Sequence, residues 1–136
     1  MVELYPYAAP DGVELLIAWL KDVAETRTDR PAGAVLPWIT VRRIGGGDDG
    51  LTDRGLYSIH SYASTKSGAR ALGNTVHRRI LALTHGGTTV EISTGSTYVD
   101  KVVVVEHPRP VYFIPSIQRV VGTYQVHLRV NVFHES

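Results

Sequence analysis

The segment Trp38–Ala63, "WITVRRIGGGDDGLTDRGLYSIHSYA", sets two β-rich runs on either side of a stretch of glycine and aspartate. The first run, Trp38–Ile44, is rich in β-branched residues, and the second, Leu56–Ala63, alternates between two faces. Because the two runs are close in sequence, an antiparallel hairpin is the simplest way to pair them. We therefore predict two neighbouring strands joined by a long glycine-rich hairpin loop at 44–55. The side chains expected to share one face of the second strand are Tyr57, Ile59 and Ala63.

The joining segment, Ile44–Gly55, holds five glycines, three aspartates and one arginine in twelve residues. A phosphate-binding P-loop needs Lys and then Ser or Thr after its last glycine, with a helix to follow, whereas here Leu51 and Thr52 lead into a strand. A dinucleotide-binding fingerprint also needs a strand–turn–helix. The three aspartates offer carboxylates to a cation, but their spacing is not that of a calcium-binding loop. We expect a mobile hairpin loop that becomes ordered on a partner protein.

A first helix is predicted from the run "PDGVELLIAWLKDVAE" at 10–25. Asp11 is placed to cap it, and Glu14, three residues later, completes a capping-box pattern. The prolines and glycine at 31–37 then indicate a loop. The buried stripe of this helix is expected to be Val13, Leu16, Ile17, Leu20 and Val23.

A second helix is predicted within Ser64–Gly87, capped by Ser64 or Thr65 and stopped by the glycine pair at its end. Gly68 and Gly73 each cost about 1 kcal/mol in a helix interior. Their presence indicates either that the helix starts late or that it packs closely against a neighbour. The buried stripe is expected to be Ala69, Leu72, Val76, Ile80 and Leu83.

Three further strands follow: a short one at 88–92, a long one at 97–107 and one from about Arg119 to Phe133. The last has the clearest alternation in the chain. The linker at 108–118 carries four apolar residues between prolines, so either its own domain or a partner chain must cover it. The side chains expected to point to the core are Val120, Tyr124, Val126, Leu128, Val130 and Val132, and those expected to point away are Val121, Thr123, Gln125, His127, Arg129 and Asn131.

The expected element order is α-β-β-α-β-β-β over a single domain, 1–136. Antiparallel hairpins with helices on one face indicate an α+β fold of two layers, with a mostly antiparallel or mixed β-sheet and two helices packed on it. The chain of 136 residues suits one domain with one core. With 43% hydrophobic and 20% charged residues, it has the composition of a soluble globular protein.

Several classes of protein are disfavoured by composition. No apolar run approaches the roughly 18 residues needed to cross a bilayer, and the first residues lack the basic and apolar regions of a secretory signal. The chain has no cysteine, which excludes disulfides, thiolate nucleophiles and cysteine-based zinc sites. The net charge of +1 gives no general attraction to nucleic acid.

Charge is unevenly distributed along the chain. Residues 1–53 carry nine acids and five bases, whereas residues 54–136 carry four acids and nine bases. The simple interpretation is chance combined with solvated faces. The alternative is opposite charge on two surfaces, which would suit head-to-tail self-association.

No catalytic, cofactor-binding or metal site is predicted. The six histidines form no HExxH or HxH pair, and His77 and His85 would lie about 12 Å apart on a helix, too far to share a metal. Ser58 and His60 share a strand face but lack a nearby acid or a nucleophile elbow. The acids in the later strands are isolated, and the basic doublets at 42–43 and 78–79 lack interleaved aromatics, so salt bridges are favoured over nucleic-acid contacts.

The whole chain resembles the tail terminator proteins of long-tailed, non-contractile phages, especially those that infect actinobacteria. The resemblance is carried by an N-terminal helix "VELLIAWLKDVAETRTDRPAGAVLPW", by "HRRILAL" in the second helix and by the C-terminal "VGTYQVHLRVNV". Its most specific part is 42–63, in which a basic strand is followed by a Gly-Gly, Asp-Asp, Leu-Thr-Asp pattern and a strand that ends in His and Ala.

The resemblance implies structural work, with no enzymatic activity and no cofactor. Members of this family have a mixed sheet and two helices, and they assemble as a ring, usually a hexamer, on the head-proximal end of the tail tube. The expected partners are other copies of the chain, the major tail tube protein and the head–tail connector proteins, with no membrane and no sequence-specific nucleic acid, although DNA passes through such a ring. The expected location is the virion tail or neck, and the host cytoplasm during assembly.

The glycine–aspartate segment is the candidate contact region. Three alternatives stay open: another head–tail neck component, such as a head-completion or stopper protein; a small hydrolase or metal-dependent enzyme; and a generic α+β binding module. The residues expected to contact a neighbouring subunit or the tube are Arg42, Arg43, Asp48, Asp49, Asp53 and Arg54.

Overall fold

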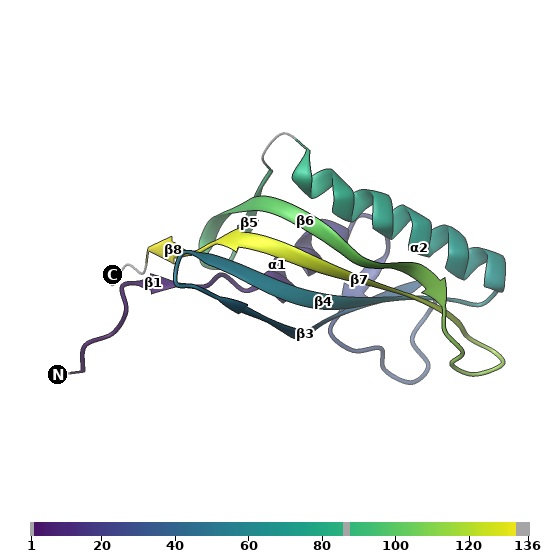
Figure 1. Cartoon of the computed structure of the whole chain (residues 1–136). Coiled ribbons are helices and arrows are strands. Elements are labelled where there is room, and N and C mark those ends of the chain that lie inside the picture. The colour runs from purple at the N-terminus through teal and green to yellow at the C-terminus, as the bar shows by residue number, and fades with distance from the viewer. Residues whose placement is uncertain (1, 86–87, 133–136) are drawn as a thin grey trace.

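The computed structural model describes residues 2–85 and 88–132 and shows a six-stranded sheet with two helices packed on one face (Figure 1). The helices are α1 (Gly12–Leu20) and α2 (Lys66–Leu81), the latter continued by the short 3-10 helix η1 (Ala82–Thr84). The strands of the sheet, in spatial order, are β2 (Glu25–Arg27), β3 (Trp38–Asp48), β4 (Thr52–Ala63), β7 (Gln118–Arg129), β6 (Gly95–Pro110) and β5 (Thr89–Ile92). The α+β class and the order α-β-β-α-β-β-β are confirmed.

Two short strands, β1 (Tyr7–Ala8) and β2, were not expected from the sequence, and the predicted last strand, from about Arg119 to Phe133, is divided at Val130 into β7 and β8 (Asn131–Val132). β1 and β8 pair with each other near the two ends of the described chain. β2 pairs in parallel with β3, whereas all other pairs in the large sheet are antiparallel, so the sheet is mixed. The segment 25–27 therefore belongs to a strand, and the first helix ends at Leu20, earlier than the predicted run.

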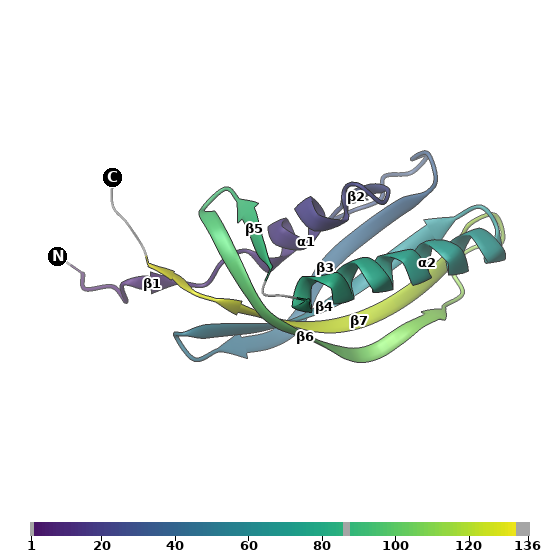
Figure 2. The ribbon, with the colours of Figure 1, turned by 90° about the horizontal axis from the view of Figure 1, so that it is seen from above.

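The sheet is strongly curled around the helices (Figure 2). Six flat strands would span about 24 Å, because neighbouring strands lie about 4.8 Å apart, whereas a helix is only about 10 Å across. Yet α1 contacts β2 and β3 near one edge and β5 at the other. The sheet must therefore bend so that both edges approach the same helix, with α2 lying over its central strands.

The core fills the concave side of this curled sheet. α1 contributes Leu15, Leu16 and Leu20, each fully buried, and α2 contributes Val76 and Ile80. Leu15 was not in the predicted stripe of α1, while Val13, Ile17 and Val23 are only half-buried. The strands supply alternate residues, as expected, and the buried set is Ile39, Val41, Tyr57, Ile59, Val99, Tyr124, Val126 and Leu128.

The helix caps are partly as predicted. Asp11 caps α1, and its carboxylate accepts hydrogen bonds from the backbone N–H groups of Val13 and Glu14. Glu14 does not close a capping box: its carboxylate accepts instead from the N–H and the hydroxyl of Ser93. These two hydrogen bonds tie α1 to the turn between β5 and β6, and they lower the pKa of Glu14.

In α2, Thr65 is the cap, and its hydroxyl accepts from the N–H of Gly68. Gly73 is there because of close packing: a Cβ at this position would lie 2.6 Å from a methyl carbon of Val120 on β7. The predicted stop at 86–87 lies outside the described residues. The predicted buried stripe of this helix is confirmed at Ala69, Val76, Ile80 and Leu83, with Leu72 half-buried.

The hairpin differs most from expectation. β3 and β4 remain paired up to Asp48 and Asp53, so the predicted loop at 44–55 is wrong in extent: only 49–51 connects the strands. Glycine is needed at position 46 because the two strands approach closely there. Gly46 has a φ of +92°, and a Cβ on it would lie 2.1 Å from the carbonyl oxygen of Arg54. A segment that looked like a free loop is therefore an extension of the two strands beyond the core.

Candidate protein-contact sites

The tip of the β3–β4 hairpin lies at the end of the molecule that also carries β1 and β8 (Figure 1). Tyr5 donates its hydroxyl hydrogen to the carbonyl oxygen of Gly50 at 3.2 Å, and the N–H of Val130 donates to the carbonyl oxygen of Leu51 at 3.0 Å. The tip is thus held from both sides by residues near the two ends of the described chain.

Two aspartates organise the turn itself. One carboxylate oxygen of Asp49 accepts from the N–H groups of Leu51 and Thr52 at 2.9 and 2.8 Å, and the other accepts from Arg54 at 3.2 Å. The two backbone hydrogen bonds are the main reason that the pKa of Asp49 falls to about 2. One oxygen of Asp48 accepts from the N–H of Gly50 at 3.0 Å. Within the described part of the chain, Asp48 makes no ion pair, so it is the carboxylate that the tip presents outward.

Arg43 and Asp53 form an ion pair inside the chain. Two guanidinium nitrogens of Arg43 donate to the two oxygens of Asp53, both at 2.9 Å, and the Asp53 side chain is only 1% exposed. The hydrogen bonds to Asp53 raise the pKa of Arg43. Both residues were candidate contacts from the sequence, and the structure uses them to hold the hairpin strands together.

Arg42 points the other way from Arg43, because successive residues of a strand face opposite sides of the sheet. Its side chain is 71% exposed and approaches Asp29 only at 3.8 Å. An exposed pair at that distance contributes little to stability. Of the six predicted contact residues, Arg42 and Asp48 are therefore the ones left most free to contact another molecule.

Arg42 lines a cavity of about 370 Å³ on the face of the sheet opposite the helices. Its floor is made by β3 and β4, and its walls come from the segment before β3 and from the linker between β6 and β7. The lining residues are Thr28, Asp29, Arg30, Thr40, Arg42, Ile44, Ser58, His60, Tyr62, Phe113 and Arg119. We call this the basic pocket, since three arginines face one aspartate in it.

Arg119 is the most enclosed cation of the basic pocket. One terminal nitrogen donates to the carbonyl oxygen of Tyr112 at 3.0 Å, and the guanidinium lies 5.0 Å from the ring centre of Phe113. Its Nε is buried and has no hydrogen-bond partner among the described residues. Arg30 lies over Tyr62 and Phe113 at 5.6 and 5.8 Å. The aromatic rings therefore hold the guanidinium groups without neutralising them.

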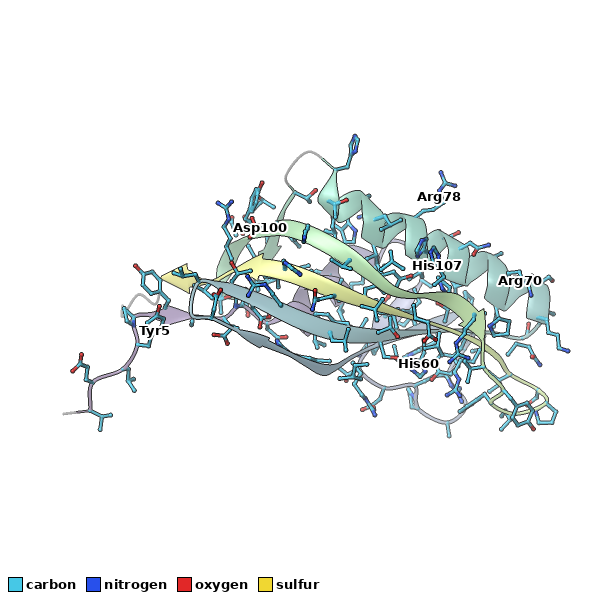
Figure 3. The ribbon with its side chains drawn as sticks, in the orientation of Figure 1. Tyr5, His60, Arg70, Arg78, Asp100 and His107 are labelled. Carbon is cyan, nitrogen blue, oxygen red and sulfur yellow. The ribbon has the colours of Figure 1, made fainter. Side chains whose placement is uncertain are left out.

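His60 lies on the floor of the pocket (Figure 3). Its Nε2 is 3.0 Å from the hydroxyl of Ser58, and its Nδ1 is 3.4 Å from the hydroxyl of Tyr62. Burial, helped by the nearby Arg119 and Arg42, lowers the pKa of His60, so the ring is neutral at pH 7. A hydrolytic triad needs a carboxylate on the second ring nitrogen, and in the described residues that position faces a tyrosine.

The linker at 111–117 folds back only in part. Phe113 packs edge-on against Tyr62, with ring centres 5.5 Å apart, while Tyr112 and Ile114 stay exposed. The linker is thus covered by its own domain at Phe113, while the covering of Tyr112 and Ile114 by a partner chain stays a prediction.

The described residues contain no group of three or more His, Asp or Glu side chains placed to hold a metal ion. His77 and His107 lie 5.0 Å apart, but His77 is engaged by the hydroxyl of Tyr124 at 2.8 Å. Among the described residues, no helix has the length and apolar character to cross a membrane.

The basic pocket was not predicted from the sequence. Arg30, Arg42 and Arg119 come from three separate segments, and no spacing along the chain relates them. The prediction that the basic doublets serve salt bridges is confirmed for Arg43, which binds Asp53, and, in looser pairs, for Arg42 with Asp29 and for Arg79 with Asp22 at 3.9 Å. Arg79 also stacks on Trp19 at 3.6 Å.

No protein-family model matches the chain, and no curated protein sequence matches it. Among solved structures, the fold is similar to that of a chain in a structure described as "Virion of native gene transfer agent (GTA) particle". The two chains share 11% sequence identity, the match covers 85% of this chain and 84% of the other, and the TM-score is 0.52. At this identity the likeness shows a shared fold that extends over nearly the full length of both chains.

Proposed function

We propose that this chain is a structural virion protein that caps the head-proximal end of a tail tube as a ring, ends tube polymerisation and presents a surface to the head connector. The observation that carries the proposal is the fold it shares, over nearly the full length of both chains, with a chain of a gene transfer agent virion. The resemblance of its sequence to tail terminator proteins supports the finer role.

The surfaces of the chain support a role in assembly. A subunit of a ring needs two different surfaces that meet head to tail. This chain has a projecting hairpin tip and, on another part of the same sheet, an open basic pocket. Exposed apolar side chains accompany both features, with Leu51 at the tip and Ile44 in the lining of the pocket. The proposed partners are further copies of the chain, six to a ring by analogy with the tail terminator family, together with the tail tube protein and the connector.

The proposal is tested by mixing the purified protein with tail tubes and, separately, with emptied heads, and by imaging both in negative stain. Density at one end of the tubes, together with loss of further tube growth, is the expected result. Binding to heads alone would instead favour a head-completion or stopper protein. Binding to neither would overturn a role at the head–tail junction.

A deletion variant tests whether the hairpin is needed for capping. Removing 46–50 shortens the hairpin but leaves the pairing of β3 and β4 within the core, 38–43 with 57–62. We expect a folded protein that no longer ends tube growth, so that tails assembled with it are too long. Tails of normal length that still join heads would show that the hairpin is not a contact.

A further inference from the structure

The hairpin tip and the basic pocket lie at opposite ends of one strand pair. β4 begins at the tip with Thr52 and first lines the pocket at Ser58, six residues later, which is about 20 Å along a strand. In Figure 3, Tyr5, whose hydroxyl contacts the tip, and His60, on the pocket floor, lie well apart along the strands. A tip therefore cannot reach the pocket of its own chain.

The basic pocket lacks an anion to match its arginines. Three arginines and one aspartate leave it with an excess of two positive charges, and among residues 2–85 and 88–132 the one ion pair within it is the loose contact of Arg42 with Asp29. The buried Nε of Arg119 is a donor with no acceptor among the described residues. The excess of guanidinium groups, of which Arg42 is largely exposed, suits the pocket to a carboxylate acceptor that arrives from another molecule. Ile44, Tyr62 and Phe113 give it apolar walls.

The tip has the complementary chemistry. Asp48 presents a carboxylate with one oxygen unused within the described chain, while its neighbour Asp49 is already engaged by Arg54 and two N–H groups. Leu51, 64% exposed, stands beside them. One carboxylate and one apolar side chain on a narrow hairpin match a small pocket that has guanidinium groups and apolar walls.

We propose that the hairpin tip of a second copy of this chain occupies the basic pocket, with Asp48 accepting from Arg42 and Arg119 and with Leu51 packing against Phe113 and Tyr62. The contact joins two different surfaces, so it is heterologous and repeats from copy to copy. The contact would join neighbouring subunits of the proposed ring. It rests on the proposed function only in that the repeated contacts are taken to close into a ring.

A nucleic-acid phosphate is the competing occupant. Binding to a DNA backbone uses a charged track with several contacts, whereas these three arginines converge on one small cavity in a chain of net charge +1. The carboxylate of a second copy is therefore the occupant that the charges favour, and a DNA arm belongs in the test.

The contact is tested by cross-linking, which the absence of cysteine makes unambiguous. Gly47→Cys places a thiol at the tip, where a Cβ meets no atom within 4 Å, and Thr28→Cys places one at the exposed rim of the pocket. Neither change removes a charged residue. The matched control is Arg78→Cys, on the exposed face of α2 (Figure 3).

The two single-cysteine variants are mixed under mild oxidation, and intact-mass spectrometry measures the disulfide-linked species. We expect the tip–pocket heterodimer to exceed, by at least about tenfold, both homodimers and the heterodimer of Gly47→Cys with Arg78→Cys, since tenfold corresponds to about 1.4 kcal/mol of preference. Circular dichroism confirms that each variant is folded. Equal yields for the pocket and the control would overturn the proposal.

A charge exchange provides the second measurement. In the cysteine variants, Asp48→Arg on the tip copy or Arg42→Asp on the pocket copy should each reduce the yield to the control level, and the two together should restore it. Restoration separates a direct contact from misfolding, because a misfolded variant is not rescued by the reverse charge. Failure of the exchange to restore cross-linking would contradict the assigned pair.

A duplex DNA oligomer is titrated into the unmodified protein and into the Arg42→Asp variant. The expected result is no difference in binding between the two. If DNA binding is lost with Arg42 and the cross-link does not form, the pocket is a phosphate site and the proposal is wrong.

Failure of this contact can be distinguished from failure of the proposed function. If the protein caps tubes but its copies do not cross-link, only the tip–pocket contact is overturned. If its copies cross-link but the protein binds neither tubes nor heads, only the virion role is overturned.

Discussion

The ion pair between Arg43 and Asp53 holds the two strands of the hairpin together just beyond the core. Asp53 is 1% exposed, whereas the Arg43 side chain is 34% exposed. The two members of the pair are therefore not equivalent. Loss of the arginine leaves a carboxylate buried without a cation, while loss of the carboxylate leaves a guanidinium that can reach water.

This asymmetry gives a prediction at the scale of single residues. Arg43→Met should lower the free energy of unfolding by about 3 kcal/mol, and Asp53→Asn by about half as much, measured by urea denaturation. Arg54→Met removes the exposed pair with Asp49 and serves as the control, with no measurable change expected. Equal effects for Arg43→Met and Arg54→Met would show that the inner pair does not hold the hairpin.

The histidines give a second prediction, on pH. Burial lowers the pKa values of His60, His77 and His127 in the folded protein. The unfolded chain therefore binds more protons than the folded one as the pH falls below about 6.5, so stability should fall between about pH 7.5 and pH 5.5. His77→Gln, which keeps a hydrogen-bonding group near the hydroxyl of Tyr124, should reduce this dependence. The free energy of unfolding is measured by urea denaturation at several pH values. The same dependence of this free energy on pH in His77→Gln and in the unmodified protein would contradict the prediction.

At the scale of elements, the hairpin shows how glycine can mislead. Glycine-rich segments usually indicate loops because glycine has the most conformational freedom. Here Gly46 allows the two strands to approach closely, and a bulge between Arg43 and Gly45 adjusts the register. The segment is ordered by hydrogen bonding between the two strands and by the Arg43–Asp53 ion pair. No local sequence pattern reveals that ion pair.

The packing of α2 on β7 gives a prediction at the same scale. Gly73→Ala gains about 1 kcal/mol of helix propensity, but its methyl group would collide with Val120. Because overpacking costs about 1–3 kcal/mol, we expect a net loss of about 1 kcal/mol in thermal or urea unfolding. Asn74→Ala, next along the helix and exposed, should not destabilise.

A double variant shows whether the collision is the cause. Val120→Ala makes room for the new methyl group, so the cost of Gly73→Ala should disappear in that background. If the cost persists there, the loss has another origin than the contact with β7.

At the scale of the whole molecule, the two parts of the chain that differ in charge occupy neighbouring regions of one sheet. β2 and β3 come from the first part and form one edge, and β4, β7, β6 and β5 follow them and come almost entirely from the second part. The basic pocket joins Arg30 and Arg42 of the acidic part with Arg119 of the basic part. The acidic tip lies at the far end of the same strands.

A contact built on these charges should weaken in salt. The Debye length falls from about 8 Å at physiological ionic strength to about 3 Å at 1 M. We therefore expect the cross-linking yield between copies to fall several-fold over that range, because Arg42 is largely exposed. The cross-linking yield of Gly47→Cys with the control Arg78→Cys should not fall over the same range of salt. A yield that rises with salt would indicate an apolar contact in place of the charged one.

The element order, the alternation of β7 and the buried stripe of α2 could be predicted because they depend on neighbours in sequence. A period of two or of 3.6 residues is a local property, and burial of one face follows from it. β2 could not be predicted in this way: three residues give no periodic signal, and Thr26 is buried only because β2 adds to the edge of β3.

The candidate contact residues also separate into those that local sequence could predict and those that depend on the fold. The segment that projects, and Asp48 within it, could be identified from the sequence, because aspartates and glycines between two strands indicate a turn. Arg42 was also named, from the strand that precedes this segment. Only the curled sheet decided that Asp53 is buried against Arg43, that Arg42 faces away from both, and that Arg30 and Arg119 join Arg42 around one cavity. Periodicity sets which side a residue faces; the partners of a charge depend on which distant segments the fold brings within a few ångströms of it.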